Sequence, residues 1–176
     1  MVNLKSNYVQ VDEIWTCVRK KQKQVTPLDS PEYGDQYIFV AMDSETKIVT
    51  TFLVGKRNFE NSMMMMNDLK YRIPNKFQLT TDSFKPYFNA VDQVFGEDVD
   101  YGQIHKVYAE DASGQKRYST ASIKEVIIRP LIGQPKLKRI STSHIKRQNL
   151  TMRMQMRRFT RLKNAFSKKL KTLSTQ

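Results

Sequence analysis

The stretch QYIFVAMDSETKIVTTFLVG, residues 36–55, holds two apolar, β-branched runs joined through the polar segment SETK. Runs of this kind, bounded by turn residues, are typical of neighbouring strands in an antiparallel pair. A third run, YVQVDEIWTCV at 8–18, precedes them across the turn-rich segment TPLDSPEYGD. We therefore predict a meander of three antiparallel strands at 8–18, 36–43 and 47–55.

Beyond the meander, the spacing of apolar residues changes to the period of a helix. Apolar side chains recur every three or four residues through 59–73 and through 84–95, and Pro74 and Gly96 follow as stop signals. Each of these predicted helices leads into a further strand candidate. The two candidates are KFQLTTD at 76–82 and IHKVYA at 104–109.

The last part of the chain combines an irregular region with a helical one. Glycines and prolines within 110–138 predict an irregular insertion with one short strand, EVII at 125–128. Apolar residues then recur at helical spacing through 143–173, which predicts one long basic helix. The order is three strands, a helix, a strand, a helix, a strand and a long helix. This order predicts a ribonuclease-H-like α/β fold, a mixed sheet flanked by helices, as a single domain over 1–176.

Composition narrows the class of protein. A hydrophobic share of 39% and a charged share of 27% are those of a globular chain, not a disordered one. No apolar run approaches the roughly 18 residues of a membrane span, and the N-terminus has no signal-like run. The single cysteine, Cys17, excludes an internal disulfide and a multi-cysteine zinc site. We expect a cytoplasmic, nucleoid-associated protein with no membrane contact.

The net charge of +13 is concentrated in one segment. Residues 136–176 contain 13 Lys or Arg and no Asp or Glu. The rest of the chain holds the other 17 of the 30 basic residues and all 17 acidic residues, so its net charge is zero. A charged run is often only a solvated surface. Thirteen cations without an anion repel one another, however, so a polyanionic partner is the better explanation, and nucleic acid is the first candidate.

Two aspartates are the candidates for chemistry. Asp12 stands in the middle of the first strand, and Asp82 ends the fourth. Strands one and four are neighbours in a ribonuclease-H-like sheet, so both carboxylates could bind one Mg²⁺ or Mn²⁺ ion. Glu13 is expected to point to the opposite face of its strand, away from this site. Asp82 could instead cap the following helix, because it directly precedes Ser83.

Six stretches of the chain together resemble the DDE transposases of the Insertion Sequence One family. They are VQVDEIWT (9–16), GDQYIFVAMDSETK (34–47), LVGKRN (53–58), LTTDSFKPY (79–87), VDYGQIHKVY (99–108) and ISTSHIKRQNLTMRMQMRRFTRLKNAFSKKL (140–170). The resemblance covers nearly the whole chain, and the last stretch is its most specific part. It implies a ribonuclease-H-like catalytic domain, two divalent metal ions, and metal-dependent cleavage and transfer of DNA strands.

The resemblance also implies a catalytic Asp, Asp and Glu. Asp12 and Asp82 match the two aspartates as catalytic and metal-binding residues. The glutamate belongs at the start of the pattern Glu-Arg-Gln-Asn-Leu-Thr, with Arg or Lys seven residues later. Arg153 stands at the later position, but Lys146 occupies that of the glutamate. An ammonium group offers no lone pair to a metal ion and repels it, so Lys146 is expected to impair two-metal catalysis.

The basic segment is expected to hold DNA beside this pocket. Contacts with DNA are predicted for one face of the last helix and for three further residues, giving the set Arg147, Asn149, Arg153, Arg157, Arg158, Arg161 and Lys168. DNA, as element ends and target, is the expected partner, and a homo-oligomer on DNA stays open. The resemblance implies an N-terminal DNA-binding segment as well. We expect it to be absent here, because Asp12 lies so near the N-terminus.

The leading hypothesis is a DDE transposase catalytic domain for DNA transposition that is impaired by Lys146. One alternative is a noncatalytic nucleic-acid-binding remnant, or a domesticated protein, with the same basic helix. A ribonuclease or resolvase on the same fold is another. If a different acid replaces the missing glutamate, Glu110 and Asp111, just after the fifth strand, are the first candidates.

Overall fold

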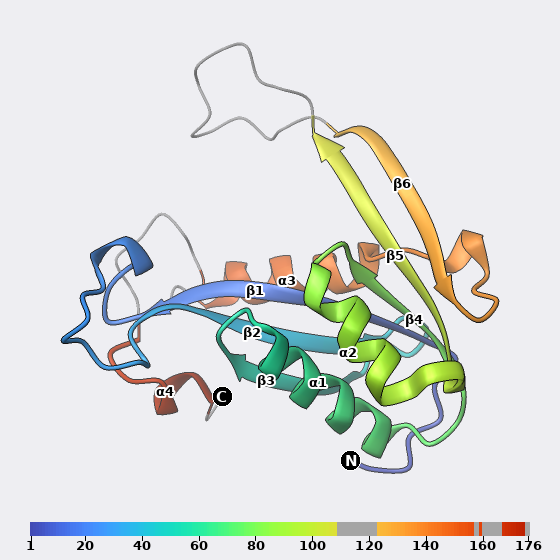
Figure 1. The fold of residues 1–176 in the computed structure, drawn as a ribbon, viewed down its shortest axis with the longest axis horizontal. Coiled ribbons are helices and arrows are strands. Elements are labelled where there is room, and N and C mark those ends of the chain that lie inside the picture. Colours follow the sequence, from blue (N-terminus) through green and yellow to red (C-terminus); the bar gives the residue numbers. More distant parts are fainter. Residues whose placement is uncertain (109–122, 157–158, 160–166, 175–176) are drawn as a thin grey trace.

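The structure, a computed structural model, describes residues 1–108, 123–156, 159 and 167–174. Its centre is one six-stranded sheet in the order β3-β2-β1-β4-β5-β6 (Figure 1). The strands are β1 Tyr8–Val18, β2 Gly34–Asp43, β3 Val49–Gly55, β4 Phe77–Asp82, β5 Val99–Tyr108 and β6 Ile123–Ile132. The α-helices are α1 Phe59–Arg72, α2 Lys85–Phe95, α3 Ser143–Gln155 and α4 Lys171–Ser174.

Strand directions define the fold class. β1, β2 and β3 form the predicted antiparallel meander, while β4 lies parallel to both β1 and β5. β6 runs antiparallel to β5 at the outer edge. The prediction of a ribonuclease-H-like mixed sheet flanked by helices is therefore confirmed by the order and directions of the strands. None of the described helices has the length and apolar character that crossing a bilayer requires.

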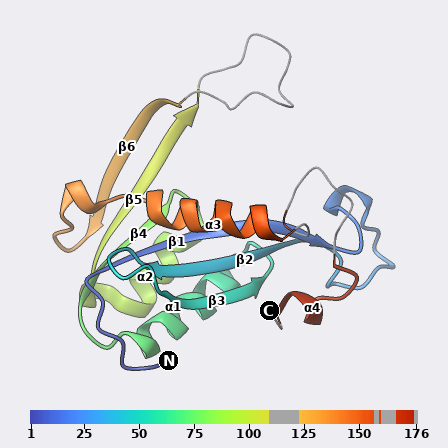
Figure 2. The same ribbon diagram turned by 180° about the vertical axis from the view of Figure 1, so that it is seen from behind.

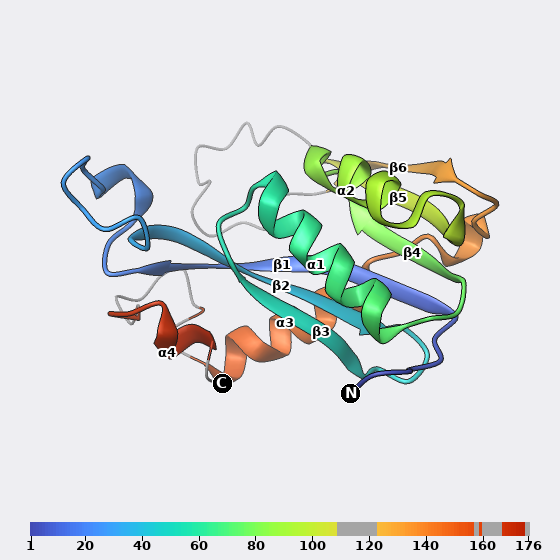
Figure 3. The same ribbon diagram turned by 60° about the horizontal axis from the view of Figure 1, so that its bottom comes forward.

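The sheet separates two apolar layers. α1 and α2 cover one face, and α3 lies on the other (Figures 2 and 3). Alternate side chains of β1 point into the two layers. Val9 and Val11 pack in the core under α1 and α2. Ile14 and Val18 pack in the core under α3. β1 is thus buried on both faces, and a charged residue in this strand needs partners.

Local signals account for α1 and α2. The Asn58 side chain accepts a hydrogen bond from the backbone N–H of Asn61 and so caps the start of α1. Met65 and Met66 are fully buried in the core, as expected for methionines that pack onto a sheet. Gly96, with φ of 51°, ends α2 in a conformation that glycine adopts without strain.

The region 110–138 was predicted as irregular, and its described part is more regular than that. β6 extends over ten residues rather than four, and β5 begins at Val99, earlier than predicted. Pro130 lies opposite Gly102 beside a register shift, on an edge strand, where a proline costs few ladder hydrogen bonds. Residues 109–122 lie outside the described part of the chain.

The prediction of one continuous helix over 143–173 is wrong. α3 ends at Gln155, and Met156 has extended backbone angles, with φ of −116° and ψ of 107°. A helix over the whole range would be about 45 Å long, whereas a strand of the length of β1 spans only about 36 Å. Beyond α3, Phe159 and Leu173 pack onto the core under that helix.

Candidate functional site

The candidate site lies where β1 and β4 separate. The two strands pair only from Tyr8 to Gln10 of β1, so Asp12 and Glu13 stand just past the point of separation. Asp82 is the last residue of β4, on the other side of the gap. One carboxylate oxygen from each of Asp12, Glu13 and Asp82 lies within 4.8 Å of the other two. Three acids therefore meet at this point, not two.

The expectation that Glu13 lies away from the site is wrong. Its side chain leaves β1 on the face opposite that of Asp12, where it lies near Tyr87 of α2. Because β4 no longer pairs with this part of β1, the carboxylate can turn into the gap between the strands. Only 5% of the Glu13 side chain is exposed, and its Oε1 atom has no hydrogen-bond partner among the described residues.

Asp12 is bound on both of its oxygens by α3. Lys146 Nζ lies 2.9 Å from Oδ1, and the Asn149 amide donates to Oδ2 at 2.9 Å. The two partners are three residues apart, so they share one face of the helix. Burial alone would lower the pKa of the Lys146 ammonium, but the Asp12 carboxylate outweighs this and raises that pKa overall.

A buried glutamine positions α3 over this strand. The Gln10 side chain accepts a hydrogen bond from the backbone N–H of Ile145, at 3.0 Å. This satisfies one of the free N–H groups in the first turn of α3, where Thr142 provides no side-chain cap. Gln10 lies two residues before Asp12 and therefore on the same face of β1. The bond fixes the position of α3 along β1, and at this position Lys146 reaches Asp12.

A second cation, Arg57, lies on the other side of the acids. Its guanidinium is 3.5 Å from Glu13 Oε2 and 3.3 Å from Asp82 Oδ2. The same group stacks on the Phe84 ring, 3.9 Å from the centroid. The other oxygen of Asp82 accepts the backbone N–H of Phe84 at 3.0 Å, just before α2. Asp82 thus takes part in the acid cluster and also satisfies the start of the helix.

These contacts decide how well the acids suit a metal ion. Burial, followed by the charge of Asp82, raises the pKa of the Glu13 carboxyl to about 7, while Arg57 opposes the rise. Carboxylate oxygens at this spacing are the hard ligands that Mg²⁺ and Mn²⁺ prefer. Such an ion would have to displace Lys146 from Asp12 and Arg57 from Asp82. The donor atoms therefore fit one divalent ion, but two cationic side chains compete for them.

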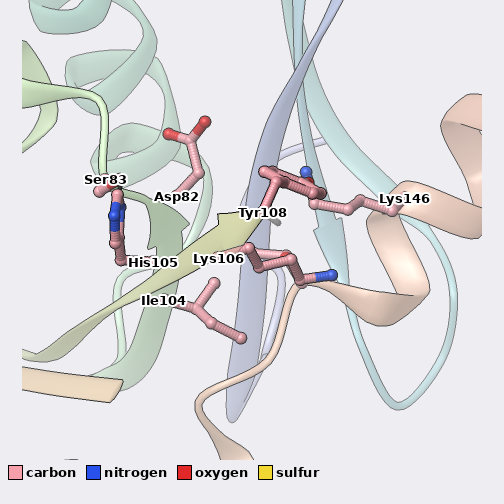
Figure 4. Close-up of a pocket in the computed structure, with 8 residues that line it drawn as sticks. Asp82, Ser83, Ile104, His105, Lys106, Tyr108 and Lys146 are labelled. Carbon is pink, nitrogen blue, oxygen red and sulfur yellow. Dashed lines mark hydrogen bonds between the residues drawn. The ribbon is translucent and has the colours of Figure 1, made fainter. Parts of the chain in front are cut away.

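A cavity of about 170 Å³ adjoins the acid cluster. Asp82 and Lys146 form part of its wall, and Ser83, Ile104, His105, Lys106, Tyr108 and Thr142 line the rest (Figure 4). His105 Nδ1 and Ser83 Oγ form a 2.7 Å hydrogen bond. The Thr142 hydroxyl is buried and has no hydrogen-bond partner among the described residues. Two ammonium groups and several hydroxyls around one opening can receive an anion.

The other residues predicted for the site are spread over several environments. Arg147 and Lys168 are exposed and Arg153 is half-buried, but Lys168 lies outside α3 because the helix ends early. Asn149, expected to contact DNA, is 2% exposed and bound to Asp12. The residues outside the described part of the chain are Arg157, Arg158, Arg161, Glu110 and Asp111.

Comparison with known proteins gives a distant structural likeness and no match by sequence. No family model matches the chain, and no curated protein matches it. The chain is similar to the cryo-EM structure of a piggyBac transposase synaptic complex with hairpin DNA, with 11% sequence identity and a TM-score of 0.42. The match covers 89% of this chain and 41% of that one, so this chain spans about two fifths of the other's length.

Proposed function

We propose that this chain is a transposase-type DNA-processing domain whose metal-dependent chemistry is impaired. One observation carries the proposal: Lys146 forms an ion pair with Asp12 at the position where the Insertion Sequence One pattern has a glutamate. The fold supports it, because the middle of β1 and the end of β4 bring Asp12 and Asp82 together as that family's chemistry requires. The missing glutamate is the reason to expect weak strand cleavage and transfer.

The residues of the site have separable roles in this proposal. Asp12, Glu13 and Asp82 would hold the Mg²⁺ or Mn²⁺ ion, which stabilises negative charge on a phosphodiester when bound. Lys146 opposes ion binding because it neutralises Asp12 and repels a cation. It also places a positive charge beside the cavity, together with Lys106. The pocket is thereby better suited to a DNA phosphate than to two metal ions.

Binding of DNA through these cations should depend strongly on salt. If about three phosphates are neutralised, affinity for a duplex falls roughly 40-fold between 50 and 200 mM salt, with little dependence on sequence. Lys106→Glu should weaken binding and reduce the salt slope by about one unit. Fluorescence anisotropy with a labelled duplex measures both. Lys23→Glu, in the exposed turn Gln22–Gln24, is the matched control and should change little.

An affinity that is the same at both salt concentrations would contradict this electrostatic account. So would a Lys106→Glu variant with the slope of the unmodified protein.

A second candidate, a noncatalytic nucleic-acid-binding protein, is favoured by the two cations that already engage the acids. Nicking of supercoiled plasmid with Mn²⁺ separates the two. Weak nicking that disappears in Asp82→Asn supports the impaired enzyme. Salt-sensitive binding with no nicking above that of Asp82→Asn supports the noncatalytic protein. Rapid nicking by the unmodified chain would contradict both.

A further inference from the structure

The outer edge of the sheet is unusually apolar. β6 is the last strand, and among the described residues no strand pairs with its outer side. Four large apolar side chains of this strand are between 37% and 49% exposed, namely Ile123, Val126, Ile128 and Leu131. An edge strand of ten residues presents a row of unpaired backbone groups, which is a template for another strand.

Part of the β5–β6 hairpin also lacks support from the rest of the sheet. β4 pairs with β5 only as far as Ile104, whereas β5 and β6 stay paired up to Tyr108. The outer part is thus a two-stranded ribbon, which rises away from the other strands in Figure 1. Two strands alone are marginally stable in water, and a third strand along β6 would stabilise them.

The sequence of β6 is complementary to itself. When two copies run antiparallel about Ile127, Glu125 of each copy lies opposite Arg129 of the other. Val126 lies opposite Ile128 in the same register. Two pairs of opposite charge and two apolar pairs therefore flank the central isoleucines, and cross-strand pairs of these kinds stabilise a sheet.

Neighbouring registers lack this complementarity. A shift of one residue in one direction places Lys124 opposite Arg129, and the opposite shift leaves Glu125 facing Pro130. In the register about Ile127, Lys124 faces Pro130, which lacks an N–H and forms the poorest pair. By symmetry this pair occurs twice, once toward each end of the contact, where a missing hydrogen bond weakens the pairing least.

We propose that two copies of this chain associate by antiparallel pairing of β6 about Ile127. The two six-stranded sheets then continue across a twofold axis, and both outer edges are covered. The contact uses only residues of β6 and therefore stands whether or not the acid cluster is catalytic.

Reversal of the charge pair tests the register. Sedimentation velocity of the full chain should show a monomer–dimer equilibrium, and Glu125→Arg or Arg129→Glu should raise the dimer dissociation constant at least tenfold. Combining the two restores opposite charges, so the double variant should dimerise nearly as well as the unmodified chain. A chain that stays monomeric at every concentration overturns the proposal, as does a double variant no better than the single ones.

Cysteine cross-linking gives an independent measurement. The native Cys17 is fully buried, so an introduced thiol is the accessible one. Ile127→Cys places two thiols opposite each other on the axis, where mild oxidation should link the copies. Leu131→Cys is the control, because its opposite residue is Ile123. Cross-linking at position 131 but not at 127 overturns the register. Circular dichroism confirms that each variant is folded.

Discussion

Replacing Lys146 with glutamate is expected to tighten Mn²⁺ and Mg²⁺ binding by at least about a hundred-fold. The change removes a cation 2.9 Å from Asp12 and adds a fourth carboxylate to the cluster. At about 4 Å and an effective dielectric near 20, one pair of unit charges contributes roughly 4 kcal/mol. Each 1.4 kcal/mol is about tenfold in affinity, so a hundred-fold gain leaves a wide margin for screening and desolvation. Isothermal titration calorimetry measures it directly.

The Lys146→Met variant is the matched control for this prediction. It removes the ammonium without adding a ligand, so its metal affinity should fall between those of the unmodified chain and Lys146→Glu. Added Mn²⁺ should also raise the Tm of Lys146→Glu, because the ion binds the folded state. Equal affinities in all three proteins would show that Lys146 does not control the site. Tight binding of two ions by the unmodified chain would show that the site is not impaired.

Glu13 should make the fold less stable as pH rises. Its pKa is near 4.5 in the unfolded chain and about 7 in the fold. The folded state therefore binds the proton more tightly, and this contribution is lost as pH increases from 4.5 through 7. A shift of this size corresponds to roughly 3 kcal/mol, or more than a hundred-fold in the folding equilibrium. Glu13→Gln should have little effect near pH 4.5 and should stabilise the protein at pH 8.

Urea denaturation in the presence of EDTA, at a series of pH values, measures this difference. Other groups titrate over the same range, so the quantity to compare is the difference in the free energy of unfolding between Glu13→Gln and the unmodified chain, called the gap below. Glu60→Gln, in the exposed first turn of α1, is the control and should show no such gap. A constant gap from pH 4.5 to 8 would mean that the Glu13 carboxyl is not buried beside Asp82.

Much of the fold could be predicted because its signals are local. Alternation along β1 and the apolar period of α1, with Pro74 behind it, depend only on neighbouring residues. The end of α3 is different, because the apolar period of the sequence continues past Gln155, where the helix ends, to Phe159 and Leu173, which pack onto the core under α3. β6 was underestimated for a related reason. An edge strand with both faces exposed shows no clear alternation, and Pro130 gives the signal of a loop.

In the site too, some features follow from local sequence and others depend on the assembled fold. The closeness of Asp12 and Asp82 could be predicted because they stand at recognisable places on two neighbouring strands. The direction of the Glu13 side chain was also correct, but its position near Asp82 depends on the separation of β1 from β4, which only the assembled sheet shows. Arg57 was missed, since a single arginine in the short connection between β3 and α1 belongs to no pattern. Asn149 looked like a surface residue because only the docking of α3 buries it.

The ion pair between Lys146 and Asp12 makes each side chain compete with the ligand of the other. While the pair is closed, Lys146 occupies one oxygen of the carboxylate, and the negative charge of Asp12 offsets the charge that the ammonium offers to a phosphate. A DNA phosphate that draws Lys146 away uncovers Asp12, and an ion that takes Asp12 releases Lys146. Thermodynamic reciprocity then requires each ligand to strengthen the binding of the other by the same factor. Calorimetric titration of Mn²⁺ with and without a short duplex would measure that factor, and a value of one would mean that the pair stays closed.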